Sequence, residues 1–352
     1  MGNKIFLGLL LFVPVTIAAH FTHVSPLVVF FLSAIAIIPL ARYIGEATEV
    51  LSEYTGPALG GLLNATFGNA TELIIGIFAI KAGLLEVVKA SITGSIIGNL
   101  LLVLGMSMFF GGIKHKKQQF NRTAAMTGSA TLLLAVAALA MPAVFQLTAP
   151  VIGAQIIEEL SVFVAIFMMI IYFASLWFML RTHKHLYSEE VGEIEKVEVK
   201  WSKTKTLSIL FIATVAVAWM SEILVGSIEP LVASFGWTEL FIGVIFVAVV
   251  GNAAEHTSAI FMARKNRMDL ALQISTGSAT QIAMFVAPFL VLISLLFKEQ
   301  MSLVFNSFEL AAIVLAVMIA NIVVEDGESN WFEGLQLIMA YAIMGVAFFF
   351  HP

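Results

Sequence analysis

The chain has 352 residues, of which 60% are hydrophobic and only 12% are charged, and its formal net charge at pH 7 is −5. A soluble domain carries about a quarter charged residues, so this chain has too little polar surface for a water-soluble particle. The acidic balance argues against a nucleic-acid partner, and the absence of cysteine excludes disulfides, thiolate metal sites and cysteine nucleophiles. The composition therefore predicts a protein embedded in a lipid bilayer.

A membrane-spanning helix needs about 20 mainly apolar residues. Applied along the chain, this rule predicts an all-α, polytopic membrane protein with eleven transmembrane helices. The first span follows Lys4 and resembles a signal peptide, but its flanks lack a clear small-residue cleavage site, so we interpret it as a retained helix. The predicted spans are residues 4–20, 25–44, 57–81, 87–111, 121–145, 156–181, 205–227, 238–263, 269–297, 302–324 and 331–350.

The basic residues fall unevenly among the predicted loops. Lys and Arg accumulate in cytoplasmic loops of membrane proteins. If the N-terminus is cytoplasmic, 15 of the 18 basic residues fall on the cytoplasmic side, and only Lys81, Lys89 and Lys298 fall outside. We therefore expect a multi-pass protein of the cell membrane with a cytoplasmic N-terminus and an extracellular C-terminus.

The longest polar stretch, residues 181–205, lies in the cytoplasm under this topology. Apolar residues recur in it every three positions, which is compatible with a short amphipathic helix as well as with a solvated linker. Five glutamates make it a candidate cation-attracting or regulatory segment: Glu189, Glu190, Glu193, Glu195 and Glu198. Glu46 and Glu49, near the inner end of the second span, are further candidates for cation access or regulation.

Residues 68–105 and 251–288 align without gaps at an offset of 183 positions. Most of the ten identical positions are polar or glycine, which a membrane composition does not favour: Gly68/Gly251, Asn69/Asn252, Ala70/Ala253, Glu72/Glu255, Ile77/Ile260, Phe78/Phe261, Thr93/Thr276, Gly94/Gly277, Ser95/Ser278 and Val103/Val286. The copies begin in spans three and eight, which run in opposite directions. Spans 2–6 and 7–11 are therefore expected to form inverted repeats, as in secondary transporters.

This division predicts four units along the chain. An N-terminal transmembrane helix occupies residues 1–24, and the first inverted repeat occupies residues 25–181. A cytoplasmic acidic linker or helix follows at residues 182–204, and the second inverted repeat occupies residues 205–352.

Each copy carries one glutamate inside a predicted span. An ionisable side chain there costs several kcal/mol and usually marks function. Glu72 and Glu255 follow Gly-Asn-Ala segments that begin at Gly68 and Gly251. Glycine permits local unwinding, which frees backbone carbonyls to act as ligands. A carboxylate just beyond such a break lies in the first turn of the next half-helix, where the helix dipole favours its ionised form. We therefore predict that Glu72 and Glu255 bind a metal cation.

The other candidate ligands near these glutamates are neutral oxygens. They are the amides of Asn69, Asn252, Asn99 and Gln281 and the hydroxyls of Ser95 and Ser278. Ca²⁺ takes about six to eight oxygen ligands, whereas soft metals recruit Cys, His or Met. The Thr-Gly-Ser segments at 93–95 and 276–278 are also compatible with small-residue helix packing.

The two carboxylates suggest how the site could exchange ions. In a low-dielectric interior they repel one another when both are ionised, so an empty site takes up protons and a divalent cation displaces them. His256 follows Glu255 directly and is a candidate proton relay, although a hydrogen-bonded packing role is equally compatible. Glu222 and Glu309 lie near the outer ends of their spans and are interpreted as interfacial groups.

Three segments resemble one known family. Gly-Asn-Ala-Thr-Glu, with Thr-Gly-Ser and Asn99-Leu-Leu-Leu-Val-Leu-Gly behind it, resembles the first repeat motif of the Ca²⁺/H⁺ antiporter (CAX) family of the cation/Ca²⁺ exchanger superfamily. Gly-Asn-Ala-Ala-Glu-His, with Gly-Ser-Ala-Thr-Gln281-Ile-Ala, resembles the second, and Asp326-Gly-Glu-Ser-Asn-Trp-Phe-Glu-Gly also resembles that family. The resemblance covers nearly the whole chain and is closest to bacterial members.

The resemblance implies Ca²⁺ export driven by the proton gradient, with Glu72 and Glu255 as alternating Ca²⁺ and H⁺ ligands. Sodium-coupled relatives commonly have an extra acidic residue where this chain has Gln281-Ile282, which favours H⁺ as the counter-ion. The implied partners are Ca²⁺, H⁺ and the lipid bilayer; a homo-oligomer is left open, and no cofactor is expected.

Three other functions compete with this interpretation. The nearest is an exchanger of a different ion pair, Na⁺ for Ca²⁺ or H⁺ for Mn²⁺. A cation channel would use the glutamates as a passive filter. An intramembrane enzyme is disfavoured, because the chain lacks His-Glu-X-X-His, a Gly-X-Gly-Asp protease pair and an aspartate-rich prenyl-phosphate motif.

Overall fold

The computed structural model describes residues 2–149, 151, 153–183 and 201–351, and almost all of them are helical. The glutamates predicted at 189–198 therefore lie outside the described residues. The α-helices are α1 (Gly2–Leu9), α2 (Phe12–Phe21), α3 (Pro26–Phe67), α4 (Ala70–Lys81), α5 (Leu85–Ile97), α6 (Leu104–His115), α7 (Arg122–Thr148), α8 (Ala154–Trp177), α10 (Lys203–Gly226), α11 (Ile228–Phe235), α12 (Glu239–Phe241), α13 (Ala248–Gly251), α14 (Ala253–Arg264), α15 (Met268–Gln281), α16 (Ala287–Ser294), α17 (Ser307–Val323) and α18 (Trp331–Phe350).

The described chain also contains π-helical turns and one short strand pair. The π-helical turns are η1 (Gly98–Val103), η2 (Phe178–Thr182), η3 (Ile242–Val247) and η4 (Ile282–Val286). The strands β1 (Gln118–Gln119) and β2 (Glu328–Ser329) pair antiparallel, with Gln118 opposite Ser329. The strand pair therefore joins the α6–α7 connection to the α17–α18 connection.

Several helical stretches are suited to a bilayer. Seven in the described part of the chain are long and apolar enough to cross a membrane, and the bent pair Glu239–Gly251 with Ala253–Arg264 would add an eighth. Ile5–Phe21 and Ser307–Val323 are apolar but shorter. The chain is thus a helical, multi-pass membrane protein.

One predicted boundary is wrong. A loop was expected between spans ending at 44 and beginning at 57, but α3 continues from Pro26 to Phe67. The polar residues that suggested a loop, among them the exposed Glu49, lie on one face of α3, while Ala47 and Val50 are buried on another. A window that measures hydropathy detects the apolar segment and not the end of the helix, so it could not place the boundary.

α3 is nevertheless sharply bent. A Cβ atom on Gly60 would lie 2.8 Å from the Cβ of Ser52, eight residues earlier. In a straight helix those positions would be about 12 Å apart along the axis. The two arms of α3 therefore run in different directions, which leaves room for separate spans in the predicted places.

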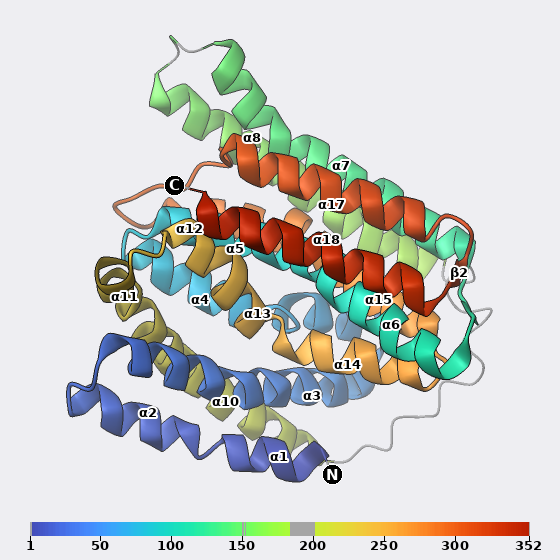
Figure 1. Ribbon diagram of the computed structural model, residues 1–352, viewed down its shortest axis with the longest axis horizontal. Coiled ribbons are helices and arrows are strands. Elements are labelled where there is room, and N and C mark those ends of the chain that lie inside the picture. The colour runs from blue at the N-terminus through green and yellow to red at the C-terminus, as the bar shows by residue number, and fades with distance from the viewer. Residues whose placement is uncertain (1, 150, 152, 184–200, 352) are drawn as a thin grey trace.

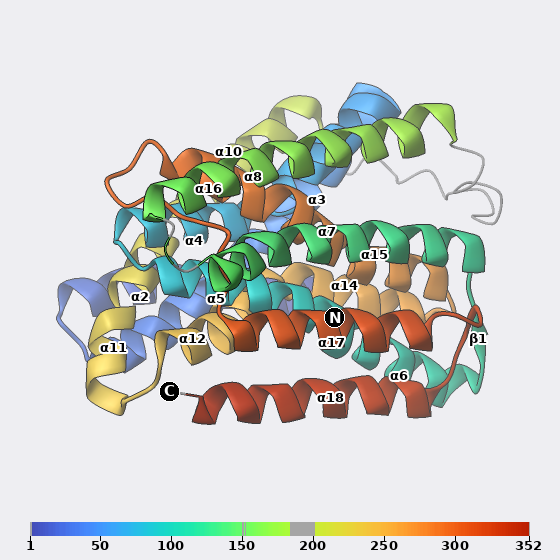
Figure 2. The same ribbon diagram turned by 90° about the horizontal axis from the view of Figure 1, so that it is seen from above.

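The helices pack around the broken segments (Figures 1 and 2). α3 packs against α2 and α10 on one side of the molecule, and α18 packs against α6 on another. Between them, α5 packs against η3, and α14 packs against α6 and α15. Each broken helix thus lies in the interior, beside a helix from the other half of the chain.

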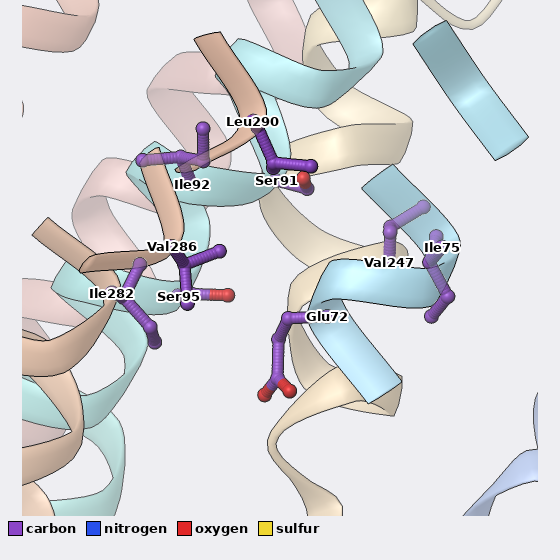
Figure 3. A pocket seen from close by; sticks show the side chains of 9 residues that line it. All are labelled: Glu72, Ile75, Ser91, Ile92, Ser95, Val247, Ile282, Val286 and Leu290. Carbon is purple, nitrogen blue, oxygen red and sulfur yellow. The ribbon is translucent and has the colours of Figure 1, made fainter. Parts of the chain in front are cut away.

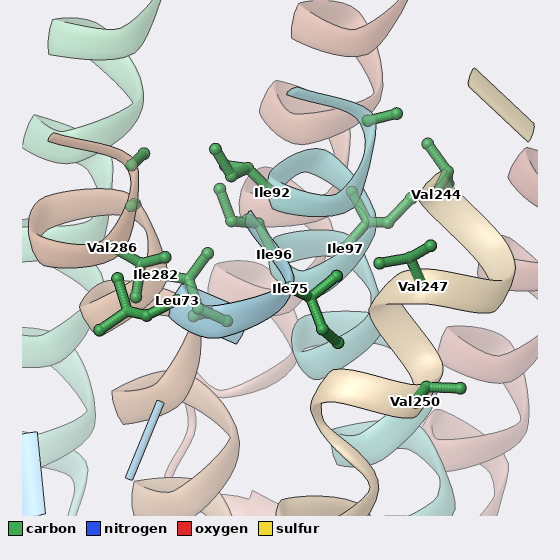
Figure 4. Packing of buried hydrophobic residues seen from close by; sticks show 14 of the residues in the cluster. Leu73, Ile75, Ile92, Ile96, Ile97, Val244, Val247, Val250, Ile282 and Val286 are labelled. Carbon is green, nitrogen blue, oxygen red and sulfur yellow. The ribbon is translucent and has the colours of Figure 1, made fainter. Parts of the chain in front are cut away.

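Branched aliphatic side chains fill the space between these central helices (Figure 4). Ile96, Ile97 and Val244 have no exposed surface, and Ile282 and Val286 are 1% exposed. In lipid the hydrophobic effect does not drive helices together, so close packing and dispersion hold this centre. Such packing fixes the backbone that carries the polar residues described below.

Equivalent elements recur at the offset of the two sequence copies. The bounds of α14 are those of α4 shifted by 183 positions, and α5 and α15 each run into a π-helical turn. π-Helical turns within α-helices are frequent at functional sites. The left-handed residues Gly83 (φ 80°) and Asn266 (φ 62°), which follow α4 and α14, also stand at this offset.

Candidate cation-binding site

Two helices are broken where the Gly-Asn-Ala segments predict a break. Asn69 (φ −106°, ψ 23°) separates α3 from α4, and Asn252 (φ −91°, ψ 14°) separates α13 from α14. The second break bends the helix pair by 60°. Glu72 and Glu255 lie in the first turns of α4 and α14, as expected. Each carboxylate therefore stands at the positive end of a half-helix.

Amide hydrogen bonds connect the two halves of the chain at these breaks. Asn69 Nδ2, at the break between α3 and α4, donates to Gln281 Oε1 at 2.6 Å, at the end of α15. Asn99 Nδ2, in η1, donates to Asn252 Oδ1 at 2.8 Å. Each break is thus held by an amide from the other half. The sequence nominated all four residues, and the structure brings them together in two pairs.

Asn252 uses its amide fully within the protein. Its Nδ2 donates to Ser95 Oγ at 2.7 Å and to the Ala248 carbonyl at 2.9 Å. Its Oδ1 accepts from Asn99 and, at 3.4 Å, from Ser278 Oγ. Asn252 therefore shapes the break and aligns both serines.

Other oxygens in the same region are buried without a hydrogen-bond partner among the described residues. They are both carboxylate oxygens of Glu72, Oε2 of Glu255, and the Oδ1 atoms of Asn69 and Asn99. A buried oxygen without a partner loses its hydration and gains nothing in return, so such groups are rare in folded proteins. A hard cation would supply the missing interaction, and the whole set is oxygen, as Ca²⁺ prefers.

The Glu72 side chain reaches the helix break in the other half of the chain. A Cβ atom on Gly251 would lie 3.0 Å from Glu72 Cγ and 3.4 Å from Glu72 Oε1, so the Glu72 side chain rests against the break that precedes Glu255. Gly251 is thus required for the close approach, whereas a Cβ atom on Gly68 would meet the Asn64 carbonyl of its own helix.

A small pocket lies beside Glu72. Figure 3 shows Glu72 and Ser95 pointing into the same space, and Ser91, Ile92 and Leu290 line the part of the pocket farther from the Glu72 carboxylate. Its wall is mainly aliphatic, with Ile75, Val247, Ile282 and Val286 completing it. The polar groups at the end of this pocket are thus the predicted Glu72 and Ser95.

In each Thr-Gly-Ser segment the serine and the threonine have different hydrogen-bond partners. Ser95 and Ser278 join the amide network, whereas Thr93 donates to Glu309 Oε1 at 3.2 Å and Thr276 to the Leu272 carbonyl. Glu309 lies in the first turn of α17 and is only 1% exposed, so other side chains cover it. It forms a capping box with Asn306 at the start of α17, which explains how the carboxylate is accommodated.

The remaining candidates lie away from the network or at its edge. Glu46 forms an ion pair with Arg42 at 2.8 Å, one turn apart on α3. Glu49 is exposed on the same helix. His256 is half-buried beside Glu255 in the first turn of α14, and its ring takes no part in the amide network. Within the part of the chain that the structure describes, no three His, Cys, Asp or Glu side chains cluster as a metal site. The candidate site therefore has two carboxylates, with neutral oxygens completing it.

Broken helices that meet in the interior, with an oxygen-only dicarboxylate site between them, define a multi-pass membrane protein of the ion-exchanger class. The chain belongs to the sodium/calcium exchanger protein family, whose model matches residues 25–181 and 205–350.

Full-length relatives carry more specific descriptions. A Ca(2+)/H(+) antiporter of Aphanothece halophytica is 47% identical, with 99% of this chain and 97% of the relative aligned. The Ca(2+)/H(+) antiporter ChaA of Bacillus subtilis (strain 168) is 48% identical, with 99% of each aligned.

Two solved structures of exchangers are also similar to this chain. Native YfkE superposes with a TM-score of 0.86 at 44% identity, over 98% of this chain and 100% of that one. An H+/Ca2+ exchanger CAX has a TM-score of 0.69 at 14% identity, over 99% of this chain and 92% of that one, and so supports the fold alone.

Proposed function

We propose that this protein is a secondary active transporter that exports Ca²⁺ from the cytoplasm in exchange for H⁺, by alternating access to a site that contains Glu72 and Glu255. The observation that carries the proposal is the set of buried oxygens without hydrogen-bond partners on Glu72, Glu255, Asn69 and Asn99. The aligned relatives are described as Ca²⁺/H⁺ antiporters over their full length, which supports the same ion pair and a transporter rather than an enzyme.

The exchange follows from charge balance at the two carboxylates. One Ca²⁺ neutralises Glu72 and Glu255 together, and protons can do the same. Movement of the empty, doubly charged site through a low-dielectric interior is strongly disfavoured. The site therefore crosses only when loaded, which makes exchange obligatory. Asn252 positions the break, Asn69 offers its free Oδ1 to the cation, and Gln281 holds Asn69 in place.

The architecture that we propose consists of eleven spans, with inverted repeats at 25–181 and 205–352, an N-terminal helix at 1–24 and an acidic linker at 182–204. The shared offset of α4 with α14 supports two repeats, as do the two ranges matched by the family model. The distribution of basic residues supports a cytoplasmic N-terminus and an extracellular C-terminus in the cell membrane. The lipid bilayer is then the protein's surroundings.

Two pairs of glycines support alternating access. We name the pair Gly94 and Gly243 the outer seam. The equivalent positions at the offset of 183 are Gly277 and Gly60, which we name the inner seam. In the outer seam, a Cβ atom on Gly94 would lie 2.1 Å from the Val244 carbonyl oxygen, and one on Gly243 would lie 2.5 Å from the Ala90 Cβ. The outer seam is thus tightly closed.

In the inner seam, Gly60 is packed against its own helix, where a Cβ atom on it would lie 2.8 Å from the Ser52 Cβ, but Gly277 is open. A Cβ atom on Gly277 would meet nothing within 4 Å. Gln273, which is equivalent to the fully buried Ala90, is exposed. Inverted repeats that exchange conformations would close the inner seam as the outer one opens. We therefore infer that the structure represents the state in which the site communicates with the cytoplasm.

The test is uptake of radiolabelled Ca²⁺ into everted membrane vesicles with an imposed pH gradient. Wild-type uptake should collapse when a protonophore is added, and E72Q and E255Q should abolish it while still inserting in the membrane. Uptake that persists without the pH gradient favours a channel. Uptake that follows a Na⁺ gradient, or that Mn²⁺ replaces fully, favours the alternative ion pairs.

A further inference from the structure

The turn between α14 and α15 connects both helices that carry the second half of the candidate site. α14 begins at Ala253, two residues before Glu255, and α15 ends at Gln281. Any displacement of the turn would therefore be transmitted to both residues. The last carbonyl groups of α14 have no partner within their own helix. Those of Met262 and Ala263 accept from N–H groups of the turn, and the Ala263 carbonyl, like that of Arg264, also accepts from outside the turn.

Gln118 supplies the principal contact with this turn. Its Nε2 donates to the Ala263 carbonyl at 2.8 Å and to Asn266 Oδ1 at 2.9 Å. The Gln118 side chain is 2% exposed. A Cβ atom on Gly111 of α6 would lie 2.0 Å from Gln118 Oε1, so only glycine leaves room for this side chain.

Neighbouring residues of the same segment reinforce the contact. Lys114 Nζ donates to the Arg264 carbonyl at 3.0 Å, and the His115 ring lies 3.1 Å from the same oxygen. The backbone N–H of Asn121 donates to Asp269 Oδ1 at 2.5 Å, at the start of α15. Residues 114–121 thus hold both sides of the turn.

This segment is itself anchored at a third place. β1 pairs with β2, and the Phe120 N–H donates to the Gly327 carbonyl at 3.0 Å. Arg122 Nε donates to the Glu325 carbonyl at 2.6 Å. The turn is therefore connected through residues 114–122 to α6, α7, α17 and α18.

The equivalent turn of the first half has no such clamp among the described contacts. Gly83 stands where the second half has Asn266, and a Cβ atom on it would meet nothing within 4 Å. Both turns close on their own backbone, through the Leu84 N–H to the Ala79 carbonyl at 2.9 Å and the Arg267 N–H to the Met262 carbonyl at 3.0 Å, so the difference lies in the side-chain contacts. The clamp is therefore a feature of the Glu255 side alone.

We propose that Gln118 is a positioning residue for cation binding: through the α14–α15 turn it holds Glu255 and Gln281 in register with Asn99 and Asn69. This proposal rests on the proposed exchange function. Gln118 does not touch the cation. It acts through a helix only three turns long, so its loss loosens the Glu255 half of the site.

The test compares Q118M with Q119M in the vesicle assay, at equal amounts of membrane-inserted protein. Methionine keeps the length of the side chain but donates no hydrogen bond, and the neighbouring Gln119 is exposed. Removing direct hydrogen-bond partners of metal ligands lowers affinity by about 10–100-fold. Because Gln118 acts from further away, we expect Q118M to raise the half-saturating Ca²⁺ concentration about threefold to tenfold, with Q119M unchanged.

A second variant guards against a folding defect in Q118M. N266G keeps the left-handed backbone, since glycine adopts it freely and Gly83 already does so in the first half. N266G removes only one of the two acceptors of Gln118, so we expect a smaller rise in the half-saturating Ca²⁺ concentration than in Q118M. In the Q118M background the same substitution should add still less, because the two residues act through one contact.

The outcomes separate this proposal from the proposed function. Wild-type protein without proton-coupled Ca²⁺ uptake would contradict the function itself. Coupled uptake in which Q118M and N266G both keep the wild-type half-saturation, or lose only maximal rate in proportion to protein amount, would show that the clamp is merely structural and would overturn the positioning role.

Discussion

The two glycine seams make opposite predictions for the same small substitution. Gly94→Ala places a methyl group 2.1 Å from the Val244 carbonyl oxygen, which the present state cannot accommodate without moving backbone. Gly277→Ala adds a methyl group where nothing lies within 4 Å. If the inner seam closes in the alternate state as the outer seam closes in this one, G277A penalises only the alternate state.

The size of the effect follows from packing. Inserting a methyl group into a well-packed contact costs about 1–3 kcal/mol, which corresponds to a change of roughly 5–150-fold in the balance between the two states. Alanine is favoured over glycine in a helix by roughly 1 kcal/mol, so neither variant should weaken its own helix. We therefore expect both variants to insert normally and to transport slowly. G94A disfavours the present state, whereas G277A disfavours the alternate state.

Cysteine labelling distinguishes the two cases, since the chain contains no cysteine of its own. Q273C reports on the exposed face of α15, and S91C reports on the pocket beside Glu72. With a membrane-impermeant maleimide, G94A should slow labelling of Q273C from the cytoplasmic side and expose S91C from the outside. G277A should preserve the labelling of Q273C. Transport by G277A at the wild-type rate, with unchanged labelling in G94A, would refute the exchange of seams.

Three further predictions concern single contacts in and around the site. G251A should raise the half-saturating Ca²⁺ concentration in vesicles, because its methyl group would lie 3.0 Å from Glu72 Cγ. The control G45A, whose methyl group would have nothing within 4 Å, should leave it unchanged. Equal half-saturation in the two variants would contradict a close contact between Gly251 and Glu72. N69A should likewise raise the half-saturation by removing a free ligand oxygen, while N252A should mainly lower the thermal stability of the detergent-solubilised protein, by about 1–3 kcal/mol for the groups it leaves unpaired. The same result for both would show that the two asparagines are equivalent. T93V should lower stability by about 1–3 kcal/mol, because it leaves the buried Glu309 Oε1 without its donor, and it should not change the half-saturation for Ca²⁺. A shifted half-saturation would place Thr93 in the cation site.

The sequence predicted the two helix breaks and the positions of the glutamates just beyond them, because both depend on local chemistry. The Gly-Asn pairs at 68–69 and 251–252 coincide with the breaks, and Glu72 and Glu255 follow in the first turns of α4 and α14. The course of α3 could not be predicted in the same way, because burial of Ala47 and Val50 depends on neighbours that are distant in sequence.

Contacts that depend on the packing of distant helices could not be predicted from the sequence. Asn69 and Asn252 are identical in the alignment, yet one keeps a free oxygen and the other is fully bonded, because Gln281 and Asn99 differ in length and approach. Thr93 and Glu309 are 216 positions apart, and their hydrogen bond arises only when α5 and α17 pack together. Gln118 gave no signal, since a single glutamine in a loop matches no pattern. Gly60 and Gly243 could have been found by extending the repeat alignment eight residues towards the N-terminus.

We propose that Glu72 and Glu255 couple Ca²⁺ movement to proton movement in one exchanging site. The most direct test uses purified protein in liposomes with a Ca²⁺ gradient, no Na⁺ and no initial pH gradient, and a trapped pH indicator. We expect the outward flow of Ca²⁺ to drive protons inward in the wild type, and E72Q and E255Q to abolish both fluxes. Ca²⁺ flow without a change of internal pH, or full coupled flow in either variant, would contradict it.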